Sequence, residues 1–300
     1  MAPIRKQMII VRLYGGLGNQ LFQYAAGRRL SILHGTVLKL DVSWFAKYAL
    51  RRYSLGPFRI AAEFATPEDI ASVTGADRRG LTRRLHRLRR HLKPYYRQAR
   101  FSEPRSGPFD PHFLKTPPNV YLDGYWQSEK YFQGIQDVIR EEFSLIVNQD
   151  PKSRKVAERI AATESVSIHV RRGDYVSNPN TNRHHGTCEP EYYRRAIQLL
   201  MEKVAVPHAF IFSDEPDWAA ENLALGCPAT AVAHNGAERD YEDLRLMGLC
   251  KHHIIANSSF SWWGAWLANR SRKTVVAPHK WFSERDRDTT DLIPDDWIRL

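Results

Sequence analysis

Short apolar segments that alternate with helical patterns constrain the fold of this chain more than any other feature of its sequence. Helical periodicity is expected near residues 19–33, 131–143, 191–204, 217–225, 241–249 and 259–268. Strands are expected near 7–13, 37–40, 120–123, 166–170, 209–212, 253–256 and 274–277. Because strands that alternate with helices form parallel sheets, the sequence predicts an α/β protein.

A polar segment near 148–155, which contains a proline, divides this pattern into two halves, 1–150 and 151–300. Each half begins with a strand and has about the size of a small Rossmann-like domain. We therefore expect an N-terminal and a C-terminal Rossmann-like domain.

The cysteines and the start of the chain indicate the compartment. Cys188, Cys227 and Cys250 lie far apart in the sequence, and their odd number argues against a disulfide framework or a thiolate zinc site. The apolar run from Met8 to Val11 is too short for a signal sequence or for a membrane-spanning helix, which needs about 20 residues. We expect a soluble, cytoplasmic protein.

The formal net charge of +11 comes almost wholly from residues 78–100, which contain no acidic side chain. Leu81, Leu85, Leu88 and Leu92 recur there at helical spacing, so a basic amphipathic helix is expected. Such a helix can pack on the protein by its leucines, or contact an anionic membrane surface or a lipid-linked glycan. No nucleic-acid partner is expected, because the charge is not spread with exposed aromatic residues over one surface.

The segment 165–175, SVSIHVRRGDY, is an apolar strand that ends in charged residues. Its apolar side chains alternate with Ser167, His169 and Arg171, so His169 and Arg171 should leave the sheet together at its carboxyl edge. Open α/β sheets bind ligands at that edge. A guanidinium suits phosphate, and a histidine adds a donor that becomes cationic if its pKa rises. This pattern predicts an anion site.

The two arginines of this segment need not have the same role. Arg172 should point to the opposite side from Arg171 in a regular strand, and it either binds the anion or pairs with Asp174 to hold the loop. Gly173 allows the sharp turn between Arg172 and Asp174.

The segment 15–20, GGLGNQ, is a glycine-rich turn from a strand into a helix. A dinucleotide fingerprint would need a third glycine where Leu21 stands, so a nicotinamide cofactor is not favoured. Gly16 and Gly18 let a ligand approach the backbone. Asn19 either holds a sugar hydroxyl or caps the helix.

The segment 257–268, NSSFSWWGAWLA, follows an apolar strand and begins a helix. Ser258, Ser259 and Ser261 stand in its first turn, where free N–H groups and the helix dipole favour a diphosphate. The tryptophans of the segment are expected to pack in the core.

Four segments in this order resemble the bacterial α-1,2-fucosyltransferases of glycosyltransferase family 11. The H-x-R-R-x-D pattern alone is shared with α-1,6- and protein-O-fucosyltransferases, so it indicates only a GDP-fucose donor. The segments GYWQSEKYF and ANSSFSWWGAWL are the ones specific for the α-1,2 group. The segments are GGLGNQLFQYA (15–25), GYWQSEKYF (124–132), HVRRGDY (169–175) and ANSSFSWWGAWL (256–267).

The resemblance implies a GT-B-like fold, with two Rossmann-like domains whose parallel sheets face each other across a cleft. Domain 1–150 would lean toward the acceptor and domain 151–300 would hold GDP-fucose. It implies inverting transfer of L-fucose from GDP-β-L-fucose to the 2-hydroxyl of a terminal β-galactoside, in surface glycan or O-antigen synthesis, without an obligatory metal or cofactor. Fucose transfer to another position or acceptor, and a non-catalytic glycan-binding protein, are the alternatives.

The resemblance and the residue chemistry together assign candidate roles. An acid one short helix before the serine turn would recognise guanine by similarity, and Asp243 fits that position, with Asp240 as the alternative. Tyr125, Trp126 and Gln127 either bind the acceptor or pack between domains. The catalytic candidates are Arg171, His169 and Asp174, and the remaining donor-binding candidates are Arg172, Gly18, Asn19, Ser258, Ser259, Phe260 and Ser261.

No metal site is expected. Asp286 and Asp288 flank an arginine in a charged stretch that follows no apolar strand, so they indicate a solvated loop. His184 and His185 lack a third ligand.

The base that removes the acceptor proton is not identified by spacing alone. The candidates are Asp174, Asp41, Glu129 and His185, with water or the leaving phosphate as further acceptors.

Overall fold

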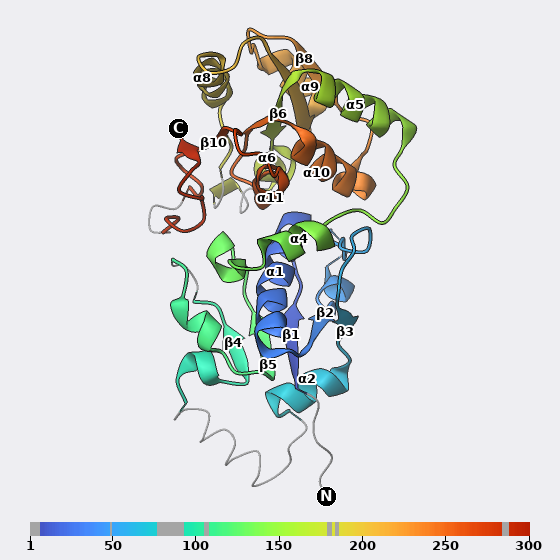
Figure 1. Cartoon of the computed structure of the whole chain (residues 1–300), viewed down its shortest axis with the longest axis vertical. Helices are drawn as coiled ribbons and strands as arrows, with labels where there is room; N and C mark the ends of the chain where they lie inside the picture. The colour runs from blue at the N-terminus through green and yellow to red at the C-terminus, as the bar shows by residue number, and fades with distance from the viewer. Residues whose placement is uncertain are drawn as a thin grey trace, which may run out of the picture. The chain divides into compact units, whose positions relative to one another are not determined.

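The computed structural model describes residues 7–48, 50–76, 93–104, 108–178, 182–183, 186–283 and 288–300, and of Asp174 and Ser177 only the backbone (Figure 1). The chain divides into two compact units. Unit 1 comprises Met1–Ile146 with Thr290–Leu292, and unit 2 comprises Val147–Thr289 with Ile293–Leu300.

Unit 1 is a parallel sheet with the strand order β3-β2-β1-β5-β4. Its strands are β1 (Met8–Arg12), β2 (Val37–Asp41), β3 (Glu63–Phe64), β4 (Arg100–Ser102) and β5 (Val120–Asp123). Its helices are α1 (Leu17–His34), α2 (Pro67–Thr74) and α4 (Gln136–Glu142), with 3-10 turns η1 (Phe45–Lys47), η2 (Tyr95–Arg97), η3 (Pro111–Lys115) and η4 (Glu129–Phe132).

Helices cover both faces of the unit 1 sheet. α1 lies so close to β1 that a Cβ on Gly27 would stand 2.1 Å from Val11 Cγ2, so only glycine fits there. On the other face, Val73 of α2 packs with Ile10 and Tyr121 of the sheet. Between these helices, the parallel pairing of β1 with β5 places their carboxyl ends side by side.

Unit 2 is a parallel sheet with the order β11-β10-β9-β6-β7-β8. Its strands are β6 (Glu164–Val170), β7 (Pro207–Ser213), β8 (Ala229–Val232), β9 (His252–Ile254), β10 (Val275–Ala277) and β11 (Ile298–Arg299). Its helices are α5 (Pro151–Ala162), α6 (Gly173–Ser177), α8 (Pro190–Met201), α9 (Pro216–Asn222), α10 (Asp240–Leu249) and α11 (Ser259–Leu267), with the 3-10 turn η5 (Ala237–Arg239).

The period-2 pattern expected for β6 is confirmed. Val166, Ile168 and Val170 pack in the cluster that α8 and α9 cover. The opposite face of the sheet is covered by α5 and α10, and α11 packs along α10 (Figure 1). On that face of β6, Ser167 Oγ lies 2.8 Å from His253 Nδ1.

In unit 1, β1 lies beside β5, which the chain enters from the edge strand β4. In unit 2, the direction of winding reverses between β6 and β9. Open α/β sheets bind ligands at the carboxyl ends of the strands on either side of this point. The loops GGLGNQ and GYWQ follow β1 and β5, and the loops RRGD and NSSF follow β6 and β9. The topology therefore brings the four sequence motifs together in pairs.

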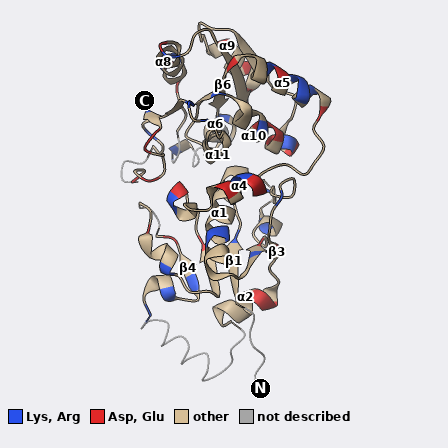
Figure 2. Ribbon diagram, in the orientation of Figure 1, with Lys and Arg blue, Asp and Glu red and all other residues tan. Residues whose placement is uncertain are grey.

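Several sequence expectations need correction. The division between the units falls between Ile146 and Val147, slightly before the expected one, and Asp150 caps α5, a helix that was not expected. The strands β3, β4, β8 and β11 were not expected. Of the basic helix expected at 78–100, residues 78–92 lie outside the described residues, which are grey in Figure 2. Residues 93–100 contain the 3-10 turn η2 and the start of β4 instead of an α-helix.

Among the described residues, no helix combines the length and the apolar character needed to cross a membrane.

Candidate functional site

The carboxylate of Asp214, just beyond β7, organises the loop after β6. Arg171 Nη1 lies 2.9 Å from Asp214 Oδ2, and the backbone N–H of Arg172 donates to Asp214 Oδ1 at 3.0 Å. A Cβ on Gly173 would stand 2.5 Å from Asp214 Oδ2, so glycine is required for this approach. Arg171 is thereby held at the sheet edge with its side chain 24% exposed.

Arg172 is held by protein groups rather than presented to a ligand. Its Nε donates to Glu215 Oε2 at 3.0 Å, and its guanidinium lies 3.7 Å from the centre of the Trp218 ring. The structural pairing expected as one alternative is therefore present, but with Glu215 as the partner. The side chain of Asp174 is outside the described residues.

His169 is buried against Phe260 of α11, with 5.4 Å between the ring centres. Burial, with a smaller contribution from Arg171, lowers the pKa of His169 to about 3. The shift is opposite to the one that would make the ring cationic, so His169 is a neutral imidazole. No described group bonds its buried Nδ1 atom, which leaves hydrogen-bonding capacity between β6 and α11.

The first turn of α11 separates the three serines into different roles. Ser258 is the N-cap residue, yet its side chain makes no capping bond to the helix. Ser261 is fully buried and its hydroxyl donates to the carbonyls of Ser258 and Ala256, at 3.1 and 3.3 Å. The Ser261 hydroxyl is thus used inside the helix turn, which favours a structural role for it. Ser258, which is also buried, and the partly exposed Ser259 stay candidates.

The rest of α11 is core, as expected. Trp262, Trp263 and Trp266 are buried. A Cβ on Gly264 would stand 2.9 Å from Met247 Cβ and Cε, so this glycine allows α11 to approach α10 closely.

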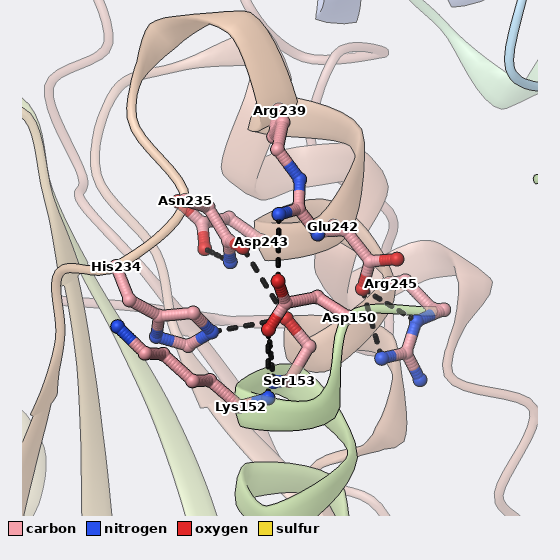
Figure 3. A network of polar contacts seen from close by, with 9 residues as sticks. All are labelled: Asp150, Lys152, Ser153, His234, Asn235, Arg239, Glu242, Asp243 and Arg245. Atoms are coloured by element: carbon pink, nitrogen blue, oxygen red, sulfur yellow. Dashed lines mark hydrogen bonds and ion pairs between the residues drawn. The ribbon is translucent and has the colours of Figure 1, made fainter. Parts of the chain in front are cut away.

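Asp243 stands in the first turn of α10, within the polar network of Figure 3. Asn235 Nδ2 donates to Asp243 Oδ1 at 2.6 Å, and Ser153 Oγ donates to Asn235 Oδ1 at 3.2 Å. Burial raises the pKa of Asp243 to about 7, and the neighbouring Asp240 and Glu242 add to the shift.

The same network ties the start of α5 to the connection between β8 and α10 (Figure 3). Arg239 Nη1 donates to Asp150 Oδ2 at 2.9 Å, and this bond lowers the pKa of Asp150 to about 2. Ser153 Oγ also lies 2.9 Å from His234 Nε2. These contacts fix the start of α10, which carries Asp243, against the start of α5.

In unit 1, Asn19 and Gln127 meet at the ends of β1 and β5. Gln127 Nε2 donates to Asn19 Oδ1 at 2.8 Å. Gly15 has a φ of 79°, and Gln20 Nε2 donates to the Gly15 carbonyl at 3.0 Å, which holds the turn before α1. Gly18 lies in the first turn of α1. The structure thus brings three of the expected residues, Gly18, Asn19 and Gln127, to one edge.

Trp126 does not fit the acceptor-stacking role. Its side chain is fully buried, and its ring lies 5.2, 5.0 and 5.3 Å from those of Phe101, Phe113 and Tyr131. Its φ of 55° turns the ring into this cluster while the preceding residue, Tyr125, stays 42% exposed. Trp126 is therefore a core residue of unit 1.

Glu103, just beyond β4, was missed by the sequence reasoning. Its two carboxylate oxygens accept the backbone N–H groups of Tyr125 and Trp126, at 2.6 and 3.0 Å. A Cβ on Gly124 would stand 2.4 Å from Glu103 Cβ. Burial raises the pKa of Glu103 to about 6.

A common signal could have identified both missed acids. Asp214 and Glu103 each follow a Phe-Ser pair at the carboxyl end of a strand. β7 was expected from the sequence, but β4 was not, because only its middle residue is buried and no apolar run marks its end.

The structure narrows the set of candidate bases. Asp41 is buried and accepts the Tyr121 hydroxyl at 2.7 Å and the Ser43 N–H at 2.9 Å, so it is a structural residue. Glu129 lies in η4. Asp286, His184, His185 and the side chain of Asp174 are outside the described residues. In the described part of the chain, no three His, Cys, Asp or Glu side chains are grouped to hold a metal ion.

Comparison with known proteins decides the family. A family model described as Glycosyl transferase family 11 matches residues 1–300. The chain belongs to glycosyltransferase family 11. It is 33% identical to the alpha-1,2-colitosyltransferase of Escherichia coli, over 98% of this chain and 99% of the relative. It is also 33% identical to the O-antigen biosynthesis glycosyltransferase WbnK of Escherichia coli, over 96% of this chain and 99% of the relative.

A more distant relative is the galactoside alpha-(1,2)-fucosyltransferase 1 of Aotus azarae, 27% identical over 85% of this chain and 63% of the relative. Among solved structures, a variant of Arabidopsis thaliana FUT1 in complex with GDP matches with a TM-score of 0.51. It is 12% identical, and the match covers 97% of this chain and 72% of that chain. This family 11 glycosyltransferase accordingly has the expected GT-B-like architecture of two parallel-sheet α/β domains.

Proposed function

We propose that this glycosyltransferase transfers L-fucose from GDP-β-L-fucose to the 2-hydroxyl of a terminal β-galactoside, with inversion at the fucose C1. The family match and the names of the relatives support α-1,2 transfer. The observation that carries the donor assignment is the convergence of Arg171, His169 and the α11 N-terminus between β6 and β9. A guanidinium, an imidazole whose buried Nδ1 no described group bonds, and the N–H groups at a helix start together suit a diphosphate.

Breaking the bond between C1 and phosphate leaves negative charge on GDP, and fixed donors stabilise that charge in the transition state. Arg171 supplies the cation. Its bond to Asp214 uses part of its fork of five N–H donors and fixes the direction of the rest. His169, a neutral imidazole, contributes a hydrogen bond rather than a charge. Phe260 holds the imidazole ring in place.

Asp243 is proposed to recognise the guanine, whose N1–H and 2-amino group are donors that need an ionised carboxylate. Asn235 holds one oxygen of that carboxylate. On the acceptor side, Asn19 and Gln127 are proposed to bind sugar hydroxyls, and Tyr125 to pack against the galactose ring. The GDP in the Arabidopsis protein is consistent with a guanine nucleotide donor.

Colitose transfer is the second candidate, favoured by the alpha-1,2-colitosyltransferase among the relatives. Colitose is L-fucose without the 3-hydroxyl group, so the two donors share the diphosphate, the guanine and the reacting carbon. A site that bonds the 3-hydroxyl would reject colitose strongly, whereas an apolar site would discriminate weakly.

The deciding experiment offers GDP-fucose and GDP-colitose in parallel to lactose and longer β-galactosides, in the presence of EDTA, with the product linkage determined by NMR. Transfer of fucose to the 2-hydroxyl is the expected result. Preferred transfer of colitose would support the second candidate, and transfer to another hydroxyl would contradict the linkage. An absolute requirement for Mn²⁺ would contradict the metal-independent mechanism.

The natural acceptor is proposed to be a galactose-terminated repeat of a surface glycan, carried on a lipid. One relative is named for O-antigen biosynthesis. A peripheral membrane contact through 78–100 would bring a cytoplasmic enzyme to such an acceptor, and vesicle flotation of the full chain with anionic lipids tests it.

A further inference from the structure

Four aromatic rings form a continuous run along the carboxyl edge of unit 1. The Tyr48 and Trp44 rings stack at 4.3 Å with 11° between their planes. Trp44 lies 6.1 Å from Tyr14, and Tyr14 lies 4.7 Å from Tyr125, measured between ring centres. Tyr14 follows β1, Trp44 follows β2 and Tyr125 follows β5, so the run crosses the ends of three adjacent strands.

Solvent reaches both ends of this run. The exposed fraction is 54% for Tyr48 and 42% for Tyr125, while Tyr14 and Trp44 are half-buried. By contrast, Trp126, the neighbour of Tyr125, is fully buried. A group of large rings left at the surface of a ligand-binding edge marks a binding surface more often than unused core.

The surroundings of the rings favour a glycan as the occupant. A pyranose presents an apolar face of C–H groups to an aromatic ring and directs its hydroxyls outward to polar groups. The polar pair Asn19 and Gln127 lies at the end of the run where Tyr125 stands. A hydrophobic peptide or lipid tail would leave that pair without a use.

We propose that Tyr14, Trp44 and Tyr48 extend the acceptor site beyond Tyr125 and bind the sugar residues that precede the terminal galactose. The identity of the terminal sugar rests on the proposed function, whereas the aromatic surface does not. The enzyme therefore binds more than one sugar residue of its acceptor. A galactose-terminated oligosaccharide binds better than galactose alone because its inner sugars cover the rings of Trp44 and Tyr48.

The test compares methyl β-galactoside with a galactose-terminated tetrasaccharide as acceptors for the wild type and for Trp44→Ala/Tyr48→Ala. The KM of the tetrasaccharide should rise about tenfold, from the loss of aromatic contacts, and that of methyl β-galactoside by much less. Trp44→Phe, which keeps an aromatic face, should restore most of the affinity. Phe64→Ala is the matched control, since Phe64 is an exposed aromatic of unit 1 outside this run.

Saturation-transfer NMR with the tetrasaccharide alone provides a readout that needs no donor. Contacts to the inner sugars in the wild type, lost in the double variant, support the inference even if neither donor is transferred. If transfer proceeds but the double variant weakens both acceptors equally, the extended site is wrong and the proposed function stands. Should the double variant unfold, Tyr48→Ser alone serves, because that side chain is mostly exposed; an unchanged tetrasaccharide KM in this folded variant would overturn the inference.

Discussion

The carboxyl edges of the two sheets use the same backbone device for different ends. In unit 2, Asp214 follows β7 and accepts the N–H of Arg172 from the loop of the adjacent strand. In unit 1, Glu103 follows β4 and accepts the N–H of Tyr125 from the loop of the adjacent strand. Each carboxylate lies where a Cβ on a neighbouring glycine would collide with its side chain. An acid beyond one strand thus shapes the loop beyond the next.

The two edges differ in the side chain that the fixed loop presents. Asp214 holds the guanidinium of Arg171, whereas Glu103 holds the backbone that carries the exposed ring of Tyr125. One edge therefore offers a cation and helix N–H groups, which suit a diphosphate, and the other offers aromatic faces and amides, which suit a sugar. The two units therefore share this loop scaffold and differ in the side chain that the loop presents to a ligand.

The largest effect is expected at the aromatic edge, where the buried Trp126 adjoins the exposed Tyr125. Trp126→Ala should lower the free energy of unfolding by about 3–5 kcal/mol, because it empties the centre of a buried aromatic cluster. Tyr125→Ala should cost about 1 kcal/mol or less and raise the KM of the acceptor instead. Denaturant titration and acceptor kinetics measure both. If Trp126→Ala keeps the stability of the wild type, Trp126 is not a core residue and is again a candidate for acceptor binding.

At the charged edge, Arg171→Ala should lower kcat/KM by about a hundredfold or more, on the scale of 3 kcal/mol for one donor to developing charge. The acceptor KM should change little. Arg194→Ala is the matched control, since Arg194 forms an exposed pair with Glu191 on α8. Near-normal kinetics for Arg171→Ala would show that the Arg171 guanidinium has no part in the mechanism. The proposed contrast between a charged edge in unit 2 and an aromatic edge in unit 1 would then be wrong.

The pH dependence of donor binding tests Asp243. Because its pKa is about 7, the KM of the GDP-sugar should rise as the pH falls below 7, approaching tenfold per pH unit. Asp243→Asn should abolish this dependence. Asp240→Asn is the matched control from the same turn; if that variant loses the pH dependence instead, Asp240 is the guanine-binding acid. The charged groups that act on Asp243 are Asp240, Glu242 and Arg239.

The Asp243 carboxyl group should also make the stability of the fold depend on pH, in the direction opposite to that of donor binding. The folded chain holds the Asp243 proton more tightly than the unfolded chain, so this group makes stability fall as the pH rises from about 4 to about 7. Asp243→Asn removes that loss. The difference in thermal midpoint between this variant and the wild type should therefore be larger, in favour of the variant, at pH 8 than at pH 4. Parallel melting curves with equal gains at both pH values would contradict the raised pKa.

The smallest effect distinguishes two serines in the first turn of α11. Ser261→Ala should cost about 1 kcal/mol of stability through its lost backbone bonds, with the donor KM unchanged. Ser258→Ala should raise the donor KM about threefold to tenfold, as one hydrogen bond to a phosphate is lost. For both variants, denaturant titration measures the stability and isothermal titration with GDP measures the donor affinity. A reversed result would exchange the structural and the binding serine.

Much of the fold could be predicted, because the signals are local. The apolar alternation of β6 located its two faces, and the glycine-rich and serine-rich loops marked the strand ends that carry the ligand motifs. Short edge strands such as β4 and β8 were missed, because their exposed residues interrupt the apolar run that marked equally short strands such as β9 and β10. The helix α5 was not expected in the dividing segment, although Asp150 and Pro151 are typical of a helix start.

The sequence by itself determined the alternation of strands and helices, the parallel sheets and the positions of the ligand loops, since these depend on neighbouring residues. Only the tertiary structure decided the partners of the site residues. Asp214 faces Arg171 because Val170 and Ser213 are level in the register of β6 and β7, and Trp126 is core because Phe101 and Phe113 surround it. Contacts between residues far apart in sequence follow from strand register and packing, which no local pattern contains.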